Sequence, residues 1–272
     1  MGYDMGKVEV KRIGGSFSHA HCSTLWKHPN TLTYVDDSDI WFFIDAQIMD
    51  VKKFINEGRH FYGWLHESKS IIPHVYEYVK NNYKSLFYHY EYIFTHDIEL
   101  LKLDDRFLFA PACGYWIEEI KRHTKSKLVS FITSNKRMCE GHNTRLQILA
   151  KYKDKVDLYG RGFNEIEKKE QGLVDYMFSF AIENGKYDTY YTEKVLDCFA
   201  TGTVPIFRGS RNILTRFNGD GIIFYTDDFD ISFLSYERYM SMMPAIIDNM
   251  EKVKDFYTVE DWLVKEYAKL FN

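Results

Sequence analysis

The chain has few cysteines, and no two of them are spaced as in a zinc or disulfide motif. Only four occur among 272 residues, with no CxxC pair: Cys22, Cys113, Cys139 and Cys198. This spacing argues against a disulfide framework and a structural zinc site, so we expect free thiols in a reducing compartment. Proline is also scarce, with five residues, while 45% of the chain is hydrophobic. A folded globular protein is therefore expected.

The sequence also lacks a strong charge excess and a long apolar run. Its 35 basic and 39 acidic residues give a formal net charge of -4, so nothing indicates a nucleic-acid partner. The amino-terminal segment has no signal-peptide core, and no stretch approaches the length of a membrane span. We expect a cytoplasmic protein without an integral membrane segment.

Short apolar runs alternate with longer amphipathic stretches, which is typical of α/β proteins. The pattern predicts strands at 8–13, 40–44, 60–65, 92–95, 107–109, 128–133, 156–159, 176–182, 204–207 and 222–225, and helices at 71–83, 143–151, 192–200 and 239–253. We expect two Rossmann-like domains, at 1–120 and at 121–258. A helix at 259–272 would cross back to the first domain.

Polar residues that follow the strand at 176–182 form the densest candidate site. Thr192 is placed to cap the next helix, which puts Glu193 and Lys194 in its first turn. A helix amino terminus suits a diphosphate, Lys194 would be stabilised by such an anion, and Glu193 could accept both hydroxyls of a ribose. An ordinary capped helix with a solvated Glu-Lys pair explains the local pattern equally well.

The string FAIENGKYDTYYTEKVLDCFATGTVPIFRGS, which starts at Phe180, resembles the donor-binding signature of glycosyltransferase family 10, the α-1,3/1,4-fucosyltransferases. The resemblance rests on the Phe-x-x-Glu-Asn element, the Tyr and Thr-Glu-Lys that follow, and the Gly-Thr-Val-Pro turn. Upstream, LVSFITSN is similar to a strand of the family that ends in Ser-Asn and is followed by an arginine, here Arg145. The likeness covers residues 128–218.

This resemblance implies a GT-B fold, with two domains facing a central cleft, and inverting transfer of a sugar from GDP-fucose to a glycan acceptor. It implies that Arg145 and Lys194 hold the diphosphate, Glu193 the ribose, and Asn184 and Tyr190 the sugar nucleotide. No cofactor beyond the donor substrate is implied. Two departures, Gly185 and Arg208, fall toward the sugar end of the expected pocket. They leave open a GT-B transferase with another nucleotide sugar.

Inverting transfer needs a base on the acceptor side, and Glu67 is our candidate. It ends the apolar run HFYGWL-HE, where burial would raise a carboxyl pKa. The alternative is that Glu67 caps the following helix. His66 is the second candidate, and Glu91 and Asp97 are weaker ones. If no base is present, the chain would be a non-catalytic nucleotide- or glycan-binding module.

A metal site is not expected. His19, His21 and Cys22 could ligate zinc, but no fourth ligand stands at a recognisable spacing. The acidic run at 36–39 precedes a strand and is better explained as a turn. The acceptor, the linkage and the oligomeric state cannot be predicted from this sequence.

Overall fold

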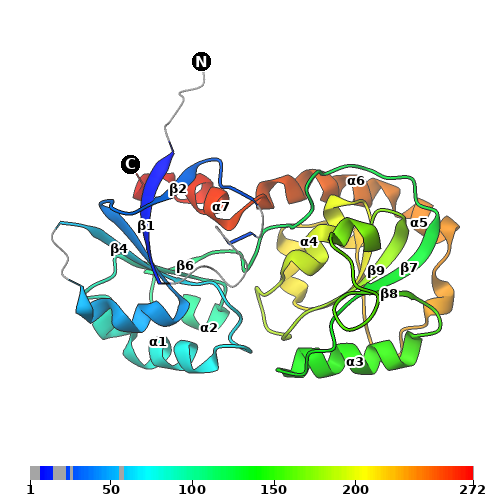
Figure 1. Ribbon diagram of the computed structural model, residues 1–272, viewed down its shortest axis with the longest axis horizontal. Coiled ribbons are helices and arrows are strands. Elements are labelled where there is room, and N and C mark those ends of the chain that lie inside the picture. The colour runs from blue at the N-terminus through cyan, green and yellow to red at the C-terminus, as the bar shows by residue number, and fades with distance from the viewer. Residues whose placement is uncertain (1–6, 15–22, 25–26, 55–57, 272) are drawn as a thin grey trace, which may run out of the picture. The chain divides into compact units, whose positions relative to one another are not determined.

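The computed structural model describes residues 7–14, 23–24, 27–54 and 58–271. These form two compact units, of which unit 1 comprises residues 1–114 with 256–272 and unit 2 comprises residues 115–255. Both contain a sheet flanked by helices (Figure 1). The domain limits that the sequence suggested, at residues 120 and 258, remain a prediction.

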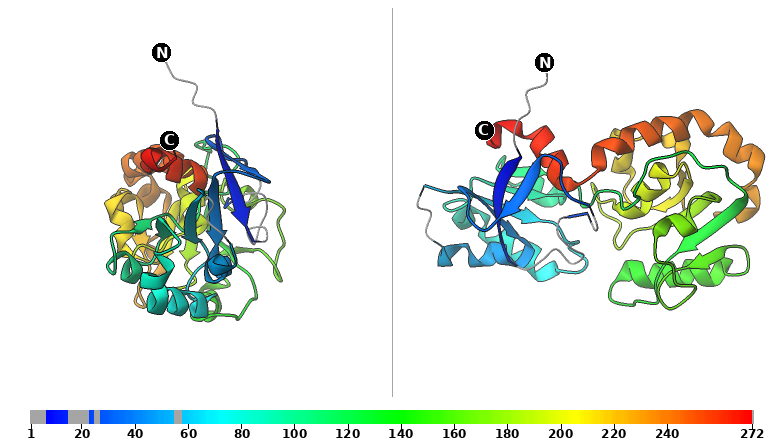
Figure 2. Two further views of the ribbon diagram at one scale, coloured as in Figure 1. Left: turned by 90° about the vertical axis from the view of Figure 1, so that its left-hand side faces the viewer. Right: turned by 45° about the horizontal axis from the view of Figure 1, so that its top comes forward.

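Unit 1 is built on a parallel six-stranded sheet of order β2-β1-β3-β4-β5-β6. Its strands are β1 (Val8–Ile13), β2 (Leu32–Val35), β3 (Ile40–Ile44), β4 (His60–Leu65), β5 (Tyr92–Thr95) and β6 (Phe107–Phe109). Its helical segments are η1 (Asp45–Lys53), α1 (Pro73–Leu86), α2 (Ile98–Leu101), α7 (Val259–Glu266) and η7 (Ala268–Leu270). The views in Figures 1 and 2 place α1 and α7 on opposite faces of this sheet.

Alternation along β3 explains how both faces of this sheet are covered. Phe43 belongs to a buried cluster with side chains of α1 and η1. Phe42 points to the other face, where its ring lies 6.2 Å from that of Phe271. The carboxyl-terminal segment therefore completes the core of unit 1, since Tyr62 Oη also donates a 3.1 Å hydrogen bond to the Leu270 carbonyl.

Unit 2 contains a parallel five-stranded sheet of order β11-β10-β9-β7-β8. Its strands are β7 (Lys127–Ile132), β8 (Asp157–Tyr159), β9 (Tyr176–Ile182), β10 (Val204–Arg208) and β11 (Ile223–Phe224). Its α-helices are α3 (Glu140–Tyr152), α4 (Glu193–Ala200), α5 (Tyr236–Ser241) and α6 (Met243–Lys252). Short 3-10 turns complete it: η2 (Lys169–Gly172), η3 (Arg211–Thr215), η4 (Gly219–Gly221), η5 (Ile231–Phe233) and η6 (Val253–Phe256), which ends at the unit boundary.

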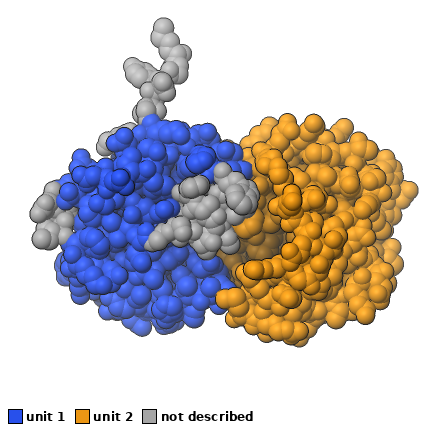
Figure 3. Space-filling model, in the orientation of Figure 1, with its two compact units in different colours: residues 1–114, 256–272 blue, residues 115–255 orange. Residues whose placement is uncertain are grey.

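Every residue of β9 is buried, as expected for a central strand of a parallel sheet covered on both faces. Figure 3 colours the units separately, so the surface of each can be followed by itself. The two parallel α/β sheets confirm the predicted fold class.

Three expectations about local structure were wrong. The strand β2 was not predicted, because four residues with one buried side chain carry little periodic signal. The single helix expected at 239–253 is divided into α5 and α6, with Pro244 in the first turn of α6, where its missing N–H costs no helical hydrogen bond. The last helix ends at Glu266 and is followed by the 3-10 turn η7.

Candidate functional site

Unit 2 has a topological switch point between its neighbouring strands β7 and β9. From β7 the chain crosses through α3 to β8 at one edge, and from β9 it crosses through α4 to β10 in the opposite direction. Open parallel sheets bind ligands where two such crossovers diverge, at the carboxyl ends of the strands. The two segments that the sequence singled out as candidate binding sites follow these strands directly, after residue 132 and after residue 182.

Arg145 and Asn184 meet at this switch point. Arg145 lies on α3 and is 7% exposed, and one of its terminal nitrogens donates to the Asn184 side-chain oxygen. Its Nε also donates a 3.4 Å hydrogen bond to the Gly141 carbonyl. The guanidinium is therefore held between the first turn of α3 and the loop after β9, where its remaining donors can serve an anion.

Gly141 allows α3 to approach the end of β9 this closely. A β-carbon at this position would lie 2.4 Å from the carbonyl oxygens of Glu183 and Asn184. The Gly141 amide instead donates a 3.2 Å hydrogen bond to the Asn184 carbonyl. Any side chain at 141 would push Arg145 away from Asn184.

The start of α4 contributes the second cation. Glu193 and Lys194 are the first residues of this helix, as predicted, and Thr192 occupies the N-cap position. The expected capping bond is absent, however: the Thr192 hydroxyl accepts from Lys194 Nζ at 2.9 Å and donates to the buried carboxylate of Glu183 at 2.8 Å. Glu183 also accepts the Thr192 amide at 2.8 Å. This carboxylate ties the end of β9 to the start of α4.

Lys194 is surrounded by oxygen atoms in this arrangement. Its Nζ lies 2.9 Å from Thr192 Oγ1, 3.2 Å from Glu193 Oε1 and 3.4 Å from Glu183 Oε2. The sequence suggested that an anion must accompany this lysine, and two carboxylates supply negative charge here. The role of Glu183 was missed, since a Glu at the end of an apolar strand gives no sign of its partners.

Glu193 lies between two lysines. Its Oε1 is 3.2 Å from Lys194 Nζ and 3.3 Å from the Nζ of Lys169. Burial by itself would raise the pKa of the Glu193 carboxyl, but the two lysines outweigh it and hold this pKa below its usual range. Lys169 also forms a 2.8 Å ion pair with the buried Asp197. Lys169 was not predicted, because it reaches the site from the short turn η2.

His142 is a further residue that the sequence did not single out. Its Nδ1 accepts the Met138 amide at 3.1 Å. Burial, followed by the charges of Arg145, Lys136 and Lys194, lowers the pKa of the His142 imidazole to about 4. Burial is the largest cause of this lowered pKa, and the three nearby cations add to it.

Tyr190 is buried, 2% exposed, in the loop between β9 and α4. Its ring stacks on that of Tyr187 at a centroid distance of 4.6 Å. The intervening Thr189 has a φ of 67°, unusual for a β-branched residue, and its amide donates a 3.2 Å hydrogen bond to Ser210 Oγ. The loop that carries Asn184 and Tyr190 is thus fixed by packing and by a strained residue.

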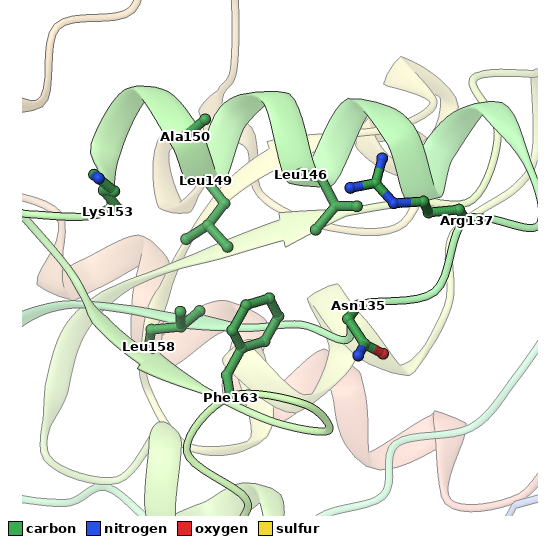
Figure 4. Close-up of a pocket in the computed structure, with 8 residues that line it drawn as sticks. All are labelled: Asn135, Arg137, Leu146, Leu149, Ala150, Lys153, Leu158 and Phe163. Atoms are coloured by element: carbon green, nitrogen blue, oxygen red, sulfur yellow. The ribbon is translucent and has the colours of Figure 1, made fainter.

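A cavity of about 590 Å³ opens beside α3. Figure 4 shows Leu146 and Leu149 of α3 pointing toward Leu158 and Phe163, with Asn135 and Arg137 at one end of the cavity. Its lining residues are Leu146, Leu149, Ala150, Lys153, Leu158, Phe163, Asn135 and Arg137. A flat ring with polar edges fits such a lining, and the cavity shares its helix with Arg145.

In unit 1, Glu67 lies just past the carboxyl end of β4 and is partly buried. Its carboxylate accepts the amide of Ser68 at 2.7 Å. The suggestion that Glu67 caps the following helix does not hold, since α1 begins at Pro73 and has Ile72 at its N-cap. His66 precedes it, with its ring 5.4 Å from that of Trp64.

The weaker base candidates have structural roles. Asp97 caps α2 and accepts the amides of Glu99 at 2.8 Å and Leu100 at 3.2 Å. Glu91 precedes β5, at the amino edge of the sheet, and contacts His60 Nδ1 at 2.5 Å. In a parallel sheet the carboxyl ends of the strands lie together. Glu91 precedes its strand and Glu67 follows its own, so the two residues lie at opposite ends of the strands, and Glu91 is no longer a base candidate.

Other sequence-based candidates lie elsewhere. His19, His21 and Cys22 fall outside the described residues. Within the described ranges, no group of three or more His, Cys, Asp or Glu is arranged to hold a metal ion. No helix in the part of the chain that is described has the length and apolar character needed to span a membrane.

The paired α/β units and the switch-point site define the class as a GT-B fold. A crystal structure of α1,3-fucosyltransferase matches with a TM-score of 0.51 and 17% identity, over 92% of this chain and 82% of that one. A second, of α1,3-fucosyltransferase with GDP, matches with a TM-score of 0.50 and 14% identity, over 100% of this chain and 93% of that one.

The chain belongs to glycosyltransferase family 10, since the family model described as "Glycosyltransferase family 10 (fucosyltransferase) C-term" matches residues 122–263. A curated relative, α-(1,3)-fucosyltransferase FucT of Helicobacter pylori, is 32% identical over 81 residues. That alignment covers 29% of this chain and only 16% of the relative. The family assignment confirms the resemblance seen in the donor-binding string and places the chain among the glycosyltransferases.

Proposed function

We propose that this chain is an inverting glycosyltransferase that transfers L-fucose from GDP-fucose to a hydroxyl group of a glycan acceptor. The observation that carries the proposal is the convergence of Arg145, Asn184 and Lys194 at the switch point of unit 2. Membership of the family supports the reaction class. The GDP in a structural relative supports the choice of guanine nucleotide.

In this proposal Arg145 and Lys194 hold the diphosphate, assisted by the amino terminus of α4. Glu193 accepts the ribose hydroxyls, and Asn184 and Tyr190 contact the sugar nucleotide. The cavity between α3 and the loop after β8 holds the guanine ring, and residues such as Leu149 and Phe163 make apolar contacts with the faces of that ring. Besides burial, nearby cations lower the pKa of His142, and these cations support a positive potential where the diphosphate would bind.

Glu67 acts as the general base. Its carboxylate takes the proton of the acceptor hydroxyl while that oxygen bonds to the anomeric carbon. The bond from this carbon to the diphosphate breaks at the same time, and GDP leaves with the electron pair. Attack from the face opposite GDP inverts the anomeric centre. Arg145 and Lys194 stabilise the negative charge that develops on the leaving diphosphate, and the proposal includes no cofactor besides the donor and acceptor substrates.

A different nucleotide sugar is the second candidate donor, and Arg208 is the observation that favours it. This half-buried arginine lines a cavity of about 510 Å³ at the carboxyl ends of β10 and β11, together with Lys186, Arg211, Asp188 and Asp227. Within the described residues no carboxylate forms an ion pair with Arg208. A sugar with more polar substituents than fucose would suit this lining.

Thermal denaturation with added nucleotides tests the donor. We expect GDP and GDP-fucose to raise the melting temperature more than UDP, ADP and their sugars, because a ligand that binds only the folded state stabilises it. Transfer from the selected donor to an array of glycans then identifies the acceptor. No shift with GDP or GDP-fucose would contradict the proposed donor, and a shift without transfer to any acceptor would favour a non-catalytic binding module.

The proposed setting is the cytoplasm, with a nucleotide-sugar donor and a glycan acceptor as partners. Cys139 and Cys198 are free thiols, the state found in a reducing compartment. Fractionation of cells that produce the protein, with detection of the chain in each fraction, tests this location.

A further inference from the structure

Asp45 stands at the carboxyl end of β3, beside the end of β4 from which Glu67 emerges. The two strands pair in parallel with Ile44 opposite Trp64, so the residues that follow them are neighbours. One oxygen of the Asp45 carboxylate, Oδ1, accepts two amides at once, from His66 at 2.7 Å and from Glu67 at 3.0 Å. The turn that carries Glu67 is thereby tied to the adjacent strand.

The backbone of Asp45 is in the left-handed region, with a φ of 50°. Glycine adopts this conformation without steric cost, whereas an L-residue with a side chain is strained there, although Asp and Asn are the most tolerant. An aspartate in such a place is explained by what its carboxylate does. The strain and the two hydrogen bonds point to the same role, which is to fix the turn after β4.

The Glu67 residue is held from its other side as well. The hydroxyl of Tyr76, on α1, donates a 2.8 Å hydrogen bond to the Glu67 carbonyl. The amide of Glu67 donates to Asp45 and its carbonyl accepts from Tyr76, so both backbone polar groups of Glu67 are held. The side chain consequently leaves the sheet at a defined place, although the carboxylate itself is bonded only to the neighbouring Ser68 amide within the described residues.

We propose that Asp45 is a positioning residue for the transfer reaction, which sets the position of the Glu67 carboxylate through the backbone of residues 66 and 67. The inference rests on the proposed function, because it takes Glu67 as the base. Asp45 touches neither substrate nor donor in this role. Its effect should therefore fall on the turnover step, since a base displaced by about 1 Å loses on the order of 100-fold in rate.

The test compares Asp45→Ala with Asp45→Asn. We expect Asp45→Ala to lower kcat at least 10-fold, with the KM for GDP-fucose and the thermal shift with GDP unchanged. Asp45→Asn should restore most of the turnover lost in Asp45→Ala, because its amide oxygen accepts the same two N–H groups. Asp50→Ala is the matched control, since Asp50 lies in the same segment η1 and forms an ion pair with the exposed Lys53.

A wild-type kcat for a folded Asp45→Ala variant would overturn the proposal. So would an Asp45→Asn variant as slow as Asp45→Ala, because the charge of the side chain and not its hydrogen bonds would then matter. If Asp45→Ala does not fold, the Asp45→Asn comparison with wild type still decides, since loss of turnover in that folded variant contradicts the role.

Hydrogen exchange measured by mass spectrometry separates this inference from the proposed function. Asp45→Ala should speed exchange of the amides of His66 and Glu67, whatever reaction the protein performs. Unchanged exchange would overturn the positioning role, even in an active enzyme. A wild-type protein that transfers no sugar would instead contradict the proposed function, with the exchange result still valid.

Discussion

The two units present their candidate residues in different ways. In unit 2, side chains hold one another, as in the group formed by Glu183, Thr192, Glu193 and Lys194. In the described part of unit 1, the Glu67 carboxylate accepts only the Ser68 amide, and the backbone of Glu67 is held by Asp45 and Tyr76. A charged network suits the binding of a large anion, because several groups share its charge. A single base needs a defined position more than it needs partners.

Removal of the Glu67 carboxylate, the proposed base, tests this comparison most severely. We expect Glu67→Gln to lower kcat by about 10²- to 10⁴-fold, because the amide cannot accept the proton of the acceptor hydroxyl. The thermal shift with GDP should stay at its wild-type value, since the donor residues belong to unit 2. Steady-state transfer assays and thermal denaturation measure the two effects. Turnover near the wild-type rate would remove Glu67 as the base.

Loss of a cation in unit 2 should affect both binding and turnover. We expect Lys194→Ala or Arg145→Ala to lower kcat/KM by about 10²- to 10³-fold, because in the proposed reaction each cation meets charge that grows on the leaving diphosphate. The thermal shift with GDP should shrink as well. Lys151→Ala is the matched control, since Lys151 lies exposed on α3. An undiminished GDP shift in both variants would place the diphosphate elsewhere.

The stability of unit 1 should depend on the charge of Asp45. Burial raises the pKa of this carboxyl from 3.8 to about 6, and the amides of Glu67 and His66 lower it only in part. The folded state thus binds the proton more tightly than the unfolded state, so stability falls as pH rises from about 4 through 6. Partial exposure reduces the effect to about 2 kcal/mol.

Asp45→Asn removes this ionisation and should stabilise unit 1 above pH 6, with little gain at pH 4. Urea unfolding can be followed by tryptophan fluorescence, because Trp41, Trp64 and Trp262 belong to unit 1. An equal gain at both pH values would show that the charge of Asp45 is not the cause.

The smallest effect is expected at Tyr76. Tyr76→Phe removes the 2.8 Å hydrogen bond to the Glu67 carbonyl while the ring and its packing remain. Since the amide of Glu67 keeps its bond to Asp45, we expect kcat to fall by only about 3- to 10-fold. Tyr78→Phe on the same helix is the control. A larger loss than in Asp45→Ala would mean that the carbonyl contact is the main restraint.

The sequence predicted the parallel sheets well because their strands are short apolar runs with clear boundaries, and β9 is the strongest case. It also predicted that Glu193 and Lys194 begin a helix, since caps are local signals. It could not predict Lys169 or His142 at the same place, because they approach from other elements. Contacts that depend on the packing of distant segments leave no periodic trace in one sequence.

The role inferred for Asp45 in unit 1 could not be predicted either, because it also depends on contacts with another segment. Asp45 follows a strand and resembles many turn residues, and only its φ and its two amide partners distinguish it. The capping bond expected of Thr192 failed for a related reason. Lys194 donates to the hydroxyl oxygen that would accept the capping bond, and Glu183, at the end of β9, accepts the hydroxyl proton. Local rules include neither of these contacts.

The carboxylates around Lys194 bear on how a product departs. A diphosphate that binds this lysine must displace oxygens of Glu183 and Glu193, which are already within 3.4 Å. When the diphosphate leaves, the same oxygens are present to take its place, so the ammonium group is never left without a counter-charge. In the proposed reaction, these carboxylates would limit the affinity for the spent nucleotide and would return the site to its starting condition between cycles.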